Sequence, residues 1–175
     1  MRFKGVYPHW NSEITLGKFY SSDIRKLVSL RQYYPLMIPD AVEDAQRYYT
    51  ERVRADNTLY FTVRKGSAVV LYAALDPIMK EQATFHAWRR KGRKRRITKK
   101  DAARILNLLL RYGFEELQMN RITATAIESV KAASRMLKVV GMTHEGTLRE
   151  FQSYNGIPHN VQIYGILRRE LCVIQ

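Results

Sequence analysis

The strongest constraint on the fold is the change from helical to strand periodicity along the second half of the chain. Ala102, Ile105 and Leu109 recur at intervals of three and four, which puts their side chains on one face of a helix. Residues 121–127 then alternate apolar with polar side chains, and a period of two is typical of a strand. A further helical stretch over 130–140 ends at a glycine, a frequent helix terminator. Because each element has an apolar face to bury, the pattern predicts a layered α/β fold.

The rest of the chain fits the same architecture. Thr98 and Asp101 have capping-box spacing and predict the start of the long helix, and Asn155-Gly156 predicts the turn between two closing strands. Upstream, we expect a strand at 14–19, helices starting at Ser22 and near Asp40, and strands at 58–64, 68–75 and 83–89. The chain has 175 residues with no internal repeat or linker. It therefore predicts one domain over residues 1–175, with a mixed sheet and helices on both faces.

Charge is the most unusual property of the composition. Thirty Lys and Arg against sixteen Asp and Glu give a net charge of +14. Much of the excess lies in one run, RRKGRKRRITKK over residues 89–100, where like charges repel one another. Such a run favours a polyanionic partner, so we predict binding of nucleic acid, the ribosome or another anion. The simpler alternative is a solvated loop. The predicted anion-binding residues are Arg89, Arg90, Lys91, Arg93, Lys94, Arg95 and Arg96.

Three stretches of the second half carry a resemblance to a known family. They are RYGFEELQMNRITATA (residues 111–126), the run from Leu137 through Gly141 into EGTLREF, and YNGIPHNVQIYGIL (residues 154–167). In these stretches the chain resembles the GNAT superfamily of acyl-CoA N-acyltransferases, and most of all its branch of ribosomal-protein N-terminal acetyltransferases. The resemblance implies a single GNAT-like domain with a mostly antiparallel sheet. It also implies acetyl transfer from acetyl-CoA to an amine of a protein N-terminus, a lysine or a small molecule.

The family's cofactor loop has the pattern Arg/Gln-x-x-Gly-x-Gly/Ala and opens a helix whose N-terminal amides bind the pyrophosphate of acetyl-CoA. Spacing from Phe114 places this pattern on residues 97–102, where Ala102 fits and Lys100 stands at the position of the central glycine. Lysine restricts positive φ and adds bulk, although basic side chains could hold phosphate directly. The cofactor-binding residues implied by the resemblance are Ala87, Trp88, Ile97, Thr98, Lys99, Lys100, Asp101 and Ala102.

Catalysis in such enzymes needs a base for the acceptor amine and a proton for the departing thiolate. The serine that often supplies this proton in the family falls on Ala133 here, with Ser134 adjacent to it. Each candidate also has a purely structural interpretation. No metal-ligand spacing occurs in the sequence, so no metal site is predicted. The candidate catalytic residues are His86, Glu150, Ser134 and His159, with Glu145 as an alternative base.

Two other interpretations stay open. One is a catalytically impaired GNAT-fold protein that binds nucleic acid, with Phe85, Trp88 and Tyr112 as stacking platforms for bases. The other is a structural or host-directed component, for example of a bacteriophage particle. The N-terminus lacks a signal-peptide pattern, no apolar stretch is long enough for a membrane span, and Cys172 is the single cysteine. We therefore expect no membrane partner and a cytoplasmic or virion-associated location. The oligomeric state is left open.

Overall fold

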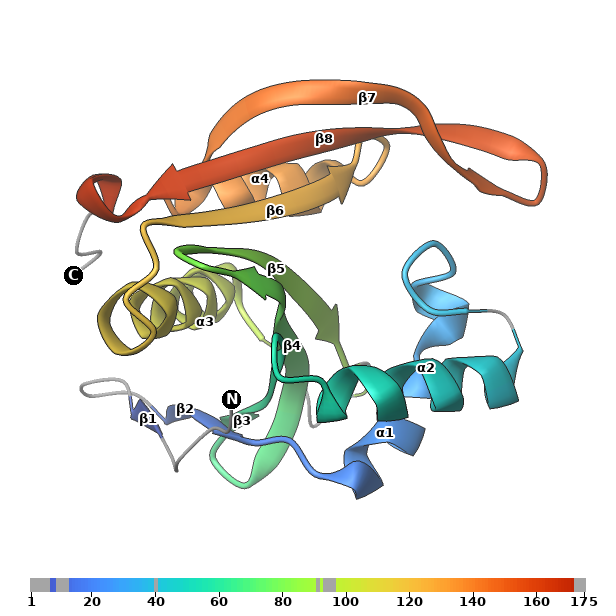
Figure 1. The fold of residues 1–175 in the computed structure, drawn as a ribbon, viewed down its shortest axis with the longest axis horizontal. Coiled ribbons are helices and arrows are strands. Elements are labelled where there is room, and N and C mark those ends of the chain that lie inside the picture. The colour runs from blue at the N-terminus through green and yellow to red at the C-terminus, as the bar shows by residue number, and fades with distance from the viewer. Residues whose placement is uncertain (1–6, 9–12, 40, 91, 93–96, 172–175) are drawn as a thin grey trace. The chain divides into compact units, whose positions relative to one another are not determined.

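The computed structural model describes residues 7–8, 13–39, 41–90, 92 and 97–171, and Figure 1 traces their fold. The chain forms two compact units. Unit 1 comprises Met1–Asp76 and Ala87–Arg96, and unit 2 comprises Pro77–His86 and Ile97–Gln175. The boundaries therefore lie within two strands, β4 (Ala68–Met79) and β5 (Gln82–Arg89). The single GNAT-like domain over residues 1–175 stays a prediction.

Unit 1 combines an antiparallel sheet with two helices. Its strands are β1 (Tyr7–Pro8), β2 (Ile14–Lys18), β3 (Leu59–Lys65) and β4 as far as Asp76, and they pair in that order. Between β2 and β3 the chain forms α1 (Ser21–Val28), the 3₁₀ turn η1 (Arg31–Tyr33) and α2 (Val42–Arg54). Helix α1 packs beside α2 (Figure 1).

Aromatic side chains build the core of unit 1. Trp88 stacks on Tyr60, with ring centroids 6.3 Å apart and ring planes 8° from parallel. Tyr49 of α2 meets Trp88 edge-on, and Phe19 meets Tyr72 in the same way. All five side chains are buried. Aromatic pairs of this kind contribute about 0.5–1.5 kcal/mol each beyond their burial, so this cluster ties helix α2 to the strands of unit 1.

The helix starts of unit 1 differ from the sequence-based prediction. Helix α1 begins at Ser21, and the Asp23 carboxylate accepts a hydrogen bond from the backbone N–H of Tyr20 at 3.0 Å. Ser22 is therefore not the cap, because Asp23 reaches the amide that opens the helix. Helix α2 begins at Val42, and Asp40, predicted to cap it, lies outside the described residues.

Unit 2 contains a mixed sheet. Its strand β5 pairs in parallel with β6 (Arg121–Ile127), while β8 (Ile157–Leu167) is antiparallel to both β6 and β7 (Thr143–Tyr154). Ahead of β6 the chain forms α3 (Lys99–Arg111) and a π-helical turn, η3 (Tyr112–Glu116). Helix α4 (Lys131–Val139) joins β6 to β7 and packs against both, and the 3₁₀ turn η4 (Arg168–Glu170) follows β8.

In unit 2, the positions of helices, strands and turns predicted from local sequence signals agree closely with the structure. The predicted strand at 121–127 is confirmed residue for residue. Gly141, which follows the C-cap Val140 of α4, has a φ of +85°, as expected for a helix terminator. Asn155 and Gly156, with φ of +51° and +75°, form the predicted turn between β7 and β8. The mixed, mostly antiparallel α/β fold is confirmed. Among the described residues, no helix has the length and apolar composition needed to cross a bilayer.

Candidate functional site

The parallel pair β5–β6 stops before either strand ends. Its partners run from Gln82↔Arg121 to Phe85↔Ala124. Beyond Ala124, β6 continues to Ile127 with only β8 recorded as its partner among the described residues. The carboxyl end of β6 therefore has one edge without a neighbour within unit 2. The carboxyl ends of parallel strands are where open α/β sheets bind their ligands.

The N-terminus of α3 has a closed capping box. The Thr98 backbone N–H donates to the Asp101 carboxylate at 2.8 Å, and the Asp101 N–H donates to the Thr98 hydroxyl at 3.1 Å. This confirms the predicted capping pair, and Asp101 is only 6% exposed. Within the described part of the chain, no acceptor is recorded for the N–H of Lys99 or Lys100. These two amides and the helix dipole form a site suited to an anion.

The start of α3 shows which part of the predicted cofactor segment over residues 97–102 is helical. Residues 99–102 lie in the first turn of α3 and not in a loop, because the Thr98 cap starts the helix at Lys99. Lys100 is helical, so a lysine there carries no positive-φ strain. The connection from β5 to α3 contains Gly92, whose φ of +128° favours glycine. Lys91 and the anion-binding candidates Arg93, Lys94, Arg95 and Arg96 lie outside the described residues.

The remaining cofactor-binding candidates fall into different surroundings. Ala87 and Trp88 belong to unit 1, and the Trp88 side chain is 3% exposed in the aromatic core. Its indole is therefore committed to packing, which leaves only the backbone of Trp88 for a ligand. Ile97 is half-buried directly before the Thr98 cap. Arg89 is exposed in β5, and its backbone N–H donates to the Tyr34 hydroxyl at 2.7 Å.

The aromatic residues around the basic run are not exposed stacking platforms. Phe85, Trp88 and Tyr112 are 6%, 3% and 9% exposed. The expectation that they stack on bases is therefore wrong, because strand and helix packing buries them. Burial also raises the pKa of the Tyr112 phenol above its ordinary value, so this hydroxyl stays protonated at neutral pH.

Ser134 lies in a buried hydrogen-bonded group that joins α4 to β8. Its hydroxyl donates to the Gln162 side-chain oxygen at 2.7 Å, and the Tyr164 hydroxyl donates to the same oxygen at 3.0 Å. Ser134 is 7% exposed and Tyr164 is 1% exposed. The single proton of the serine hydroxyl is thus engaged with Gln162. To protonate a thiolate, Ser134 would first have to break that bond.

Glu150 and His159 lie at a wide bulge in the β7–β8 hairpin. Leu148 pairs with Val161 and Gln152 with His159, so three residues of β7 stand opposite Asn160 alone. The Asn160 side chain fills this gap. Its oxygen accepts from the Glu150 backbone N–H at 2.9 Å, and its amide donates to the Glu128 carboxylate at 2.9 Å. Glu150 has a φ of +51° and an exposed carboxylate, so the bulge aims that side chain away from the ordinary strand alternation.

An ion pair across three strands of unit 2 was not predicted from the sequence. The Arg121 guanidinium of β6 pairs with the Glu145 carboxylate of β7, and both side chains lie over Gly165 of β8. A Cβ at Gly165 would overlap both charged groups. Glu145 is therefore committed to a structural contact. The signal available in the sequence was a glycine in the interior of a strand, which marks a close approach.

His86 is the last residue of β5 that belongs to unit 2, and its side chain is half-buried. It follows Phe85, where the pairing with β6 ends. The structure thus puts His86 directly after the last β5–β6 pair and Glu150 at the β7 bulge. Thr98 and Asp101 are in hydrogen-bond contact. The Ser134 hydroxyl binds Gln162 and not another candidate catalytic residue.

Comparison with known proteins gives short matches in sequence and long matches in structure. No family model matches the chain. The uncharacterized N-acetyltransferase YoaA of Bacillus subtilis is 31% identical over 67 residues, which is 38% of each chain. YdaF of the same organism, named provisionally as a ribosomal N-acetyltransferase, is 32% identical over 62 residues, or 35% of this chain and 34% of YdaF. These matches span little more than a third of the relatives' length.

The solved structures match over nearly the whole chain. The spermidine N-acetyltransferase of Vibrio cholerae in complex with CoA and spermine has a TM-score of 0.78 at 21% identity, covering 91% of this chain and 98% of that one. A chimera of that enzyme with hSSAT has the same TM-score at 20% identity, covering 90% and 97%. At this level of identity the likeness is one of fold.

Proposed function

From the GNAT fold that this chain has, we propose that it is an acyl-CoA N-acyltransferase that moves an acetyl group from acetyl-CoA to an amine. The observation that carries the proposal is that unit 2 contains both the free edge of β6 and a helix N-terminus suited to binding an anion. A CoA thioester has a pantetheine arm that can pair with a strand edge and a pyrophosphate that needs fixed N–H donors.

In the proposed complex the pyrophosphate binds at the start of α3. The backbone N–H groups of Lys99 and Lys100 donate to it, and their exposed ammonium groups add positive charge. The Thr98–Asp101 capping box is the positioning element, because it fixes where the helix begins. Glycines that normally allow close backbone approach are not needed at positions 99–102, since these residues are helical.

Acetyl-CoA is expected to stabilise the protein against unfolding. At about 100 times its dissociation constant a ligand adds about 2.7 kcal/mol, which corresponds to a rise in Tm of about 5–10 °C for a chain of this size. Differential scanning fluorimetry and isothermal titration calorimetry measure both quantities. The double change Lys99→Glu and Lys100→Glu should weaken binding at least about tenfold, while Lys138→Glu, at an exposed position of α4, should not. Absence of both heat and thermal shift at millimolar acetyl-CoA would end the acyltransferase proposal.

The chemistry follows from the thioester. The neutral amine nitrogen attacks the carbonyl carbon, a C–N bond forms, the C–S bond breaks, and the thiolate takes up a proton. His86 or Glu150 is proposed to remove the proton of the amine, with His159 as a further candidate. Because Ser134 donates to Gln162 and Ala133 has no hydroxyl, the proton for the thiolate comes from water or from the acceptor's own ammonium.

Loss of the base is expected to lower kcat/KM by about 10²-fold or more. The assay measures the rate at which CoA is released in the presence of an amine acceptor, detected with a thiol reagent between about pH 6 and about pH 9. It is applied to four variants: His86→Ala, Glu150→Ala, His159→Ala and Ser134→Ala. Ser134→Ala should mainly lower stability, because it removes the bond to Gln162. Glu115→Ala is the control, since Glu115 forms an exposed ion pair with Arg111 in the helical segment. If His86→Ala and Glu150→Ala both retain wild-type kcat/KM throughout, neither residue is the base.

A second candidate function rests on charge. The run over residues 89–100 contains nine Lys and Arg in the printed sequence, and Arg89, Lys99 and Lys100 are exposed. We propose that this run also binds nucleic acid or the ribosome, with the acetyl acceptor being a protein amine or a small amine. A cytoplasmic location fits these partners, and a virion-associated one is the alternative.

A further inference from the structure

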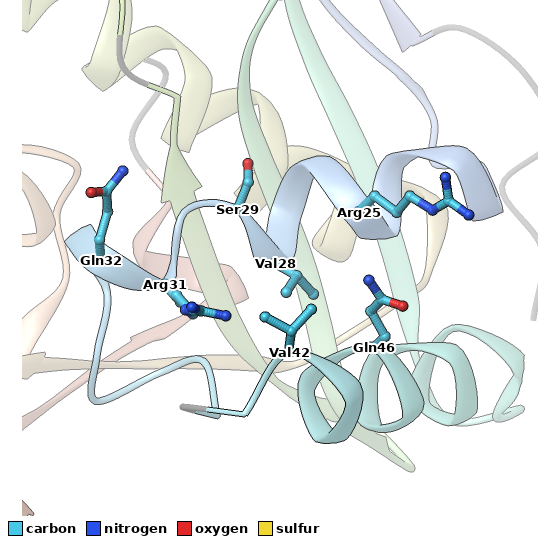
Figure 2. A pocket seen from close by; sticks show the side chains of 7 residues that line it. All are labelled: Arg25, Val28, Ser29, Arg31, Gln32, Val42 and Gln46. Atoms are coloured by element: carbon cyan, nitrogen blue, oxygen red, sulfur yellow. The ribbon is translucent and has the colours of Figure 1, made fainter.

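A pocket of about 420 Å³ lies within unit 1, between α1, η1 and α2. Figure 2 shows its lining, with Val28 of α1 and Val42 of α2 facing each other across its middle. The remaining lining is polar and comes from both sides of this apolar floor: Arg25, Ser29, Arg31, Gln32 and Gln46. The volume is in the range that binds small molecules, and this kind of lining, apolar with a few polar groups, is typical of such sites.

The two arginines occupy opposite ends of the pocket. In Figure 2, Arg25 and Gln46 lie on one side of the two valines, and Arg31 and Gln32 lie on the other. The Gln32 carboxamide points away from the Arg31 guanidinium. Each end therefore offers a guanidinium with five N–H donors. A guanidinium binds a carboxylate in a bidentate manner, so the pocket has two carboxylate-binding ends and an apolar middle.

The acidic residues nearby leave these two arginines without a recorded partner. Asp23 of α1 binds Lys26 at 3.2 Å and the Tyr20 N–H, and Asp44 of α2 binds Arg47 at 2.7 Å. Among the described residues, no carboxylate lies within ion-pair distance of Arg25 or Arg31. In the part of the chain that the structure describes, the two guanidinium groups at this concave site have no counter-charge, and a bound dianion would supply one.

From this arrangement we propose that the α1–α2 pocket binds a small aliphatic dicarboxylate, one carboxylate at Arg25 and the other at Arg31. The methylene chain packs on Val28 and Val42. A polyamine is disfavoured at the same place, because its ammonium groups would meet two guanidinium groups. The site lies entirely in unit 1 and is independent of the acyl-transfer proposal.

Glutarate is a suitable probe, with glutaramide as its neutral analogue and 1,5-diaminopentane as its cationic analogue. Isothermal titration calorimetry on the full chain should show binding of glutarate and neither of the other two. Arg25→Gln and Arg31→Gln should each weaken glutarate binding at least about tenfold, the effect of losing one charge-assisted contact. Arg54→Gln is the matched control, because Arg54 is exposed on α2 and does not line the pocket.

Three results would overturn the proposal. If glutarate and glutaramide bind with equal affinity, the carboxylate charges do not contribute to binding. Equal loss of affinity in Arg25→Gln, Arg31→Gln and Arg54→Gln would mean that the net positive charge, and not the pocket, attracts the anion. If inorganic pyrophosphate binds more tightly than glutarate, and Arg25→Gln and Arg31→Gln weaken the pyrophosphate binding, the pocket is a phosphate site in which the apolar floor has no role. Far-ultraviolet circular dichroism of each variant verifies that the helices are intact, since all three positions are exposed.

Discussion

Replacing Trp88 by alanine is expected to lower the free energy of unfolding of unit 1 by about 3–5 kcal/mol, the usual cost of removing a large buried aromatic side chain. Trp88 is 3% exposed, stacks on Tyr60 and meets Tyr49 edge-on. Its removal leaves a cavity where strand β5 meets helix α2 and strand β3. Urea denaturation followed by circular dichroism measures the loss. Since whole domains are stable by only about 5–15 kcal/mol, the variant should be visibly destabilised.

Two further variants separate packing from ligand binding. Phe151→Ala removes an aromatic side chain that is 61% exposed, so it should change stability by less than about 0.5 kcal/mol. Trp88→Phe keeps most of the packing and should recover more than half of the stability lost in Trp88→Ala. If Trp88→Phe keeps full stability but loses acetyl-CoA binding at least about tenfold, the indole contacts the cofactor and its assignment to the core alone is wrong.

Nucleic-acid binding by the basic run is expected to weaken steeply with salt. Each phosphate contact contributes about −0.7 to −0.9 to the slope of log affinity against log salt concentration. The combined change of Arg93, Lys94, Arg95 and Arg96 to serine should therefore flatten that slope by about 3 and lower the affinity at low salt by several orders of magnitude. Fluorescence anisotropy with labelled single-stranded and duplex oligonucleotides, from about 50 to about 300 mM salt, measures both quantities.

A variant with the same loss of charge elsewhere provides the control. Arg47, Arg54, Arg135 and Lys138 are exposed on α2 and α4, and their combined change to serine removes four positive charges from the helices. If that variant flattens the slope as much as the first one, net charge alone attracts the nucleic acid. If the wild type does not bind at low salt, the basic run has another partner or is solvated.

Prediction from sequence worked where the signal is local. The strand at 121–127 was readable from its own alternation of apolar and polar side chains. The Thr98–Asp101 capping box and the Asn155-Gly156 turn depend on backbone preferences and hydrogen bonds within a few residues. Those preferences hold in almost any tertiary setting. The resemblance of residues 111–126 and 154–167 to the GNAT superfamily rests on the same segments, and the fold it implied is confirmed.

The arrangement of the candidate site could be predicted only in part, because it depends on the residue at which helix α3 begins. Counting from Phe114 put the cofactor loop on residues 97–102, whereas the capping box starts α3 at Lys99 and makes most of that stretch helical. Both the capping signal and the loop pattern were readable in the sequence, but only the backbone shows which residues of the segment are helical.

The sequence by itself determined the order of the elements, the helix cap, the closing turn and the excess of positive charge. Tertiary structure alone decided which distant side chains meet. It buried Trp88 among aromatic residues, committed Ser134 to Gln162, and brought Val28 of α1 and Val42 of α2 to the same pocket. The physical reason is range: backbone propensities act over a few neighbouring residues, whereas burial and ion pairing depend on strand register and helix packing between segments far apart in the chain.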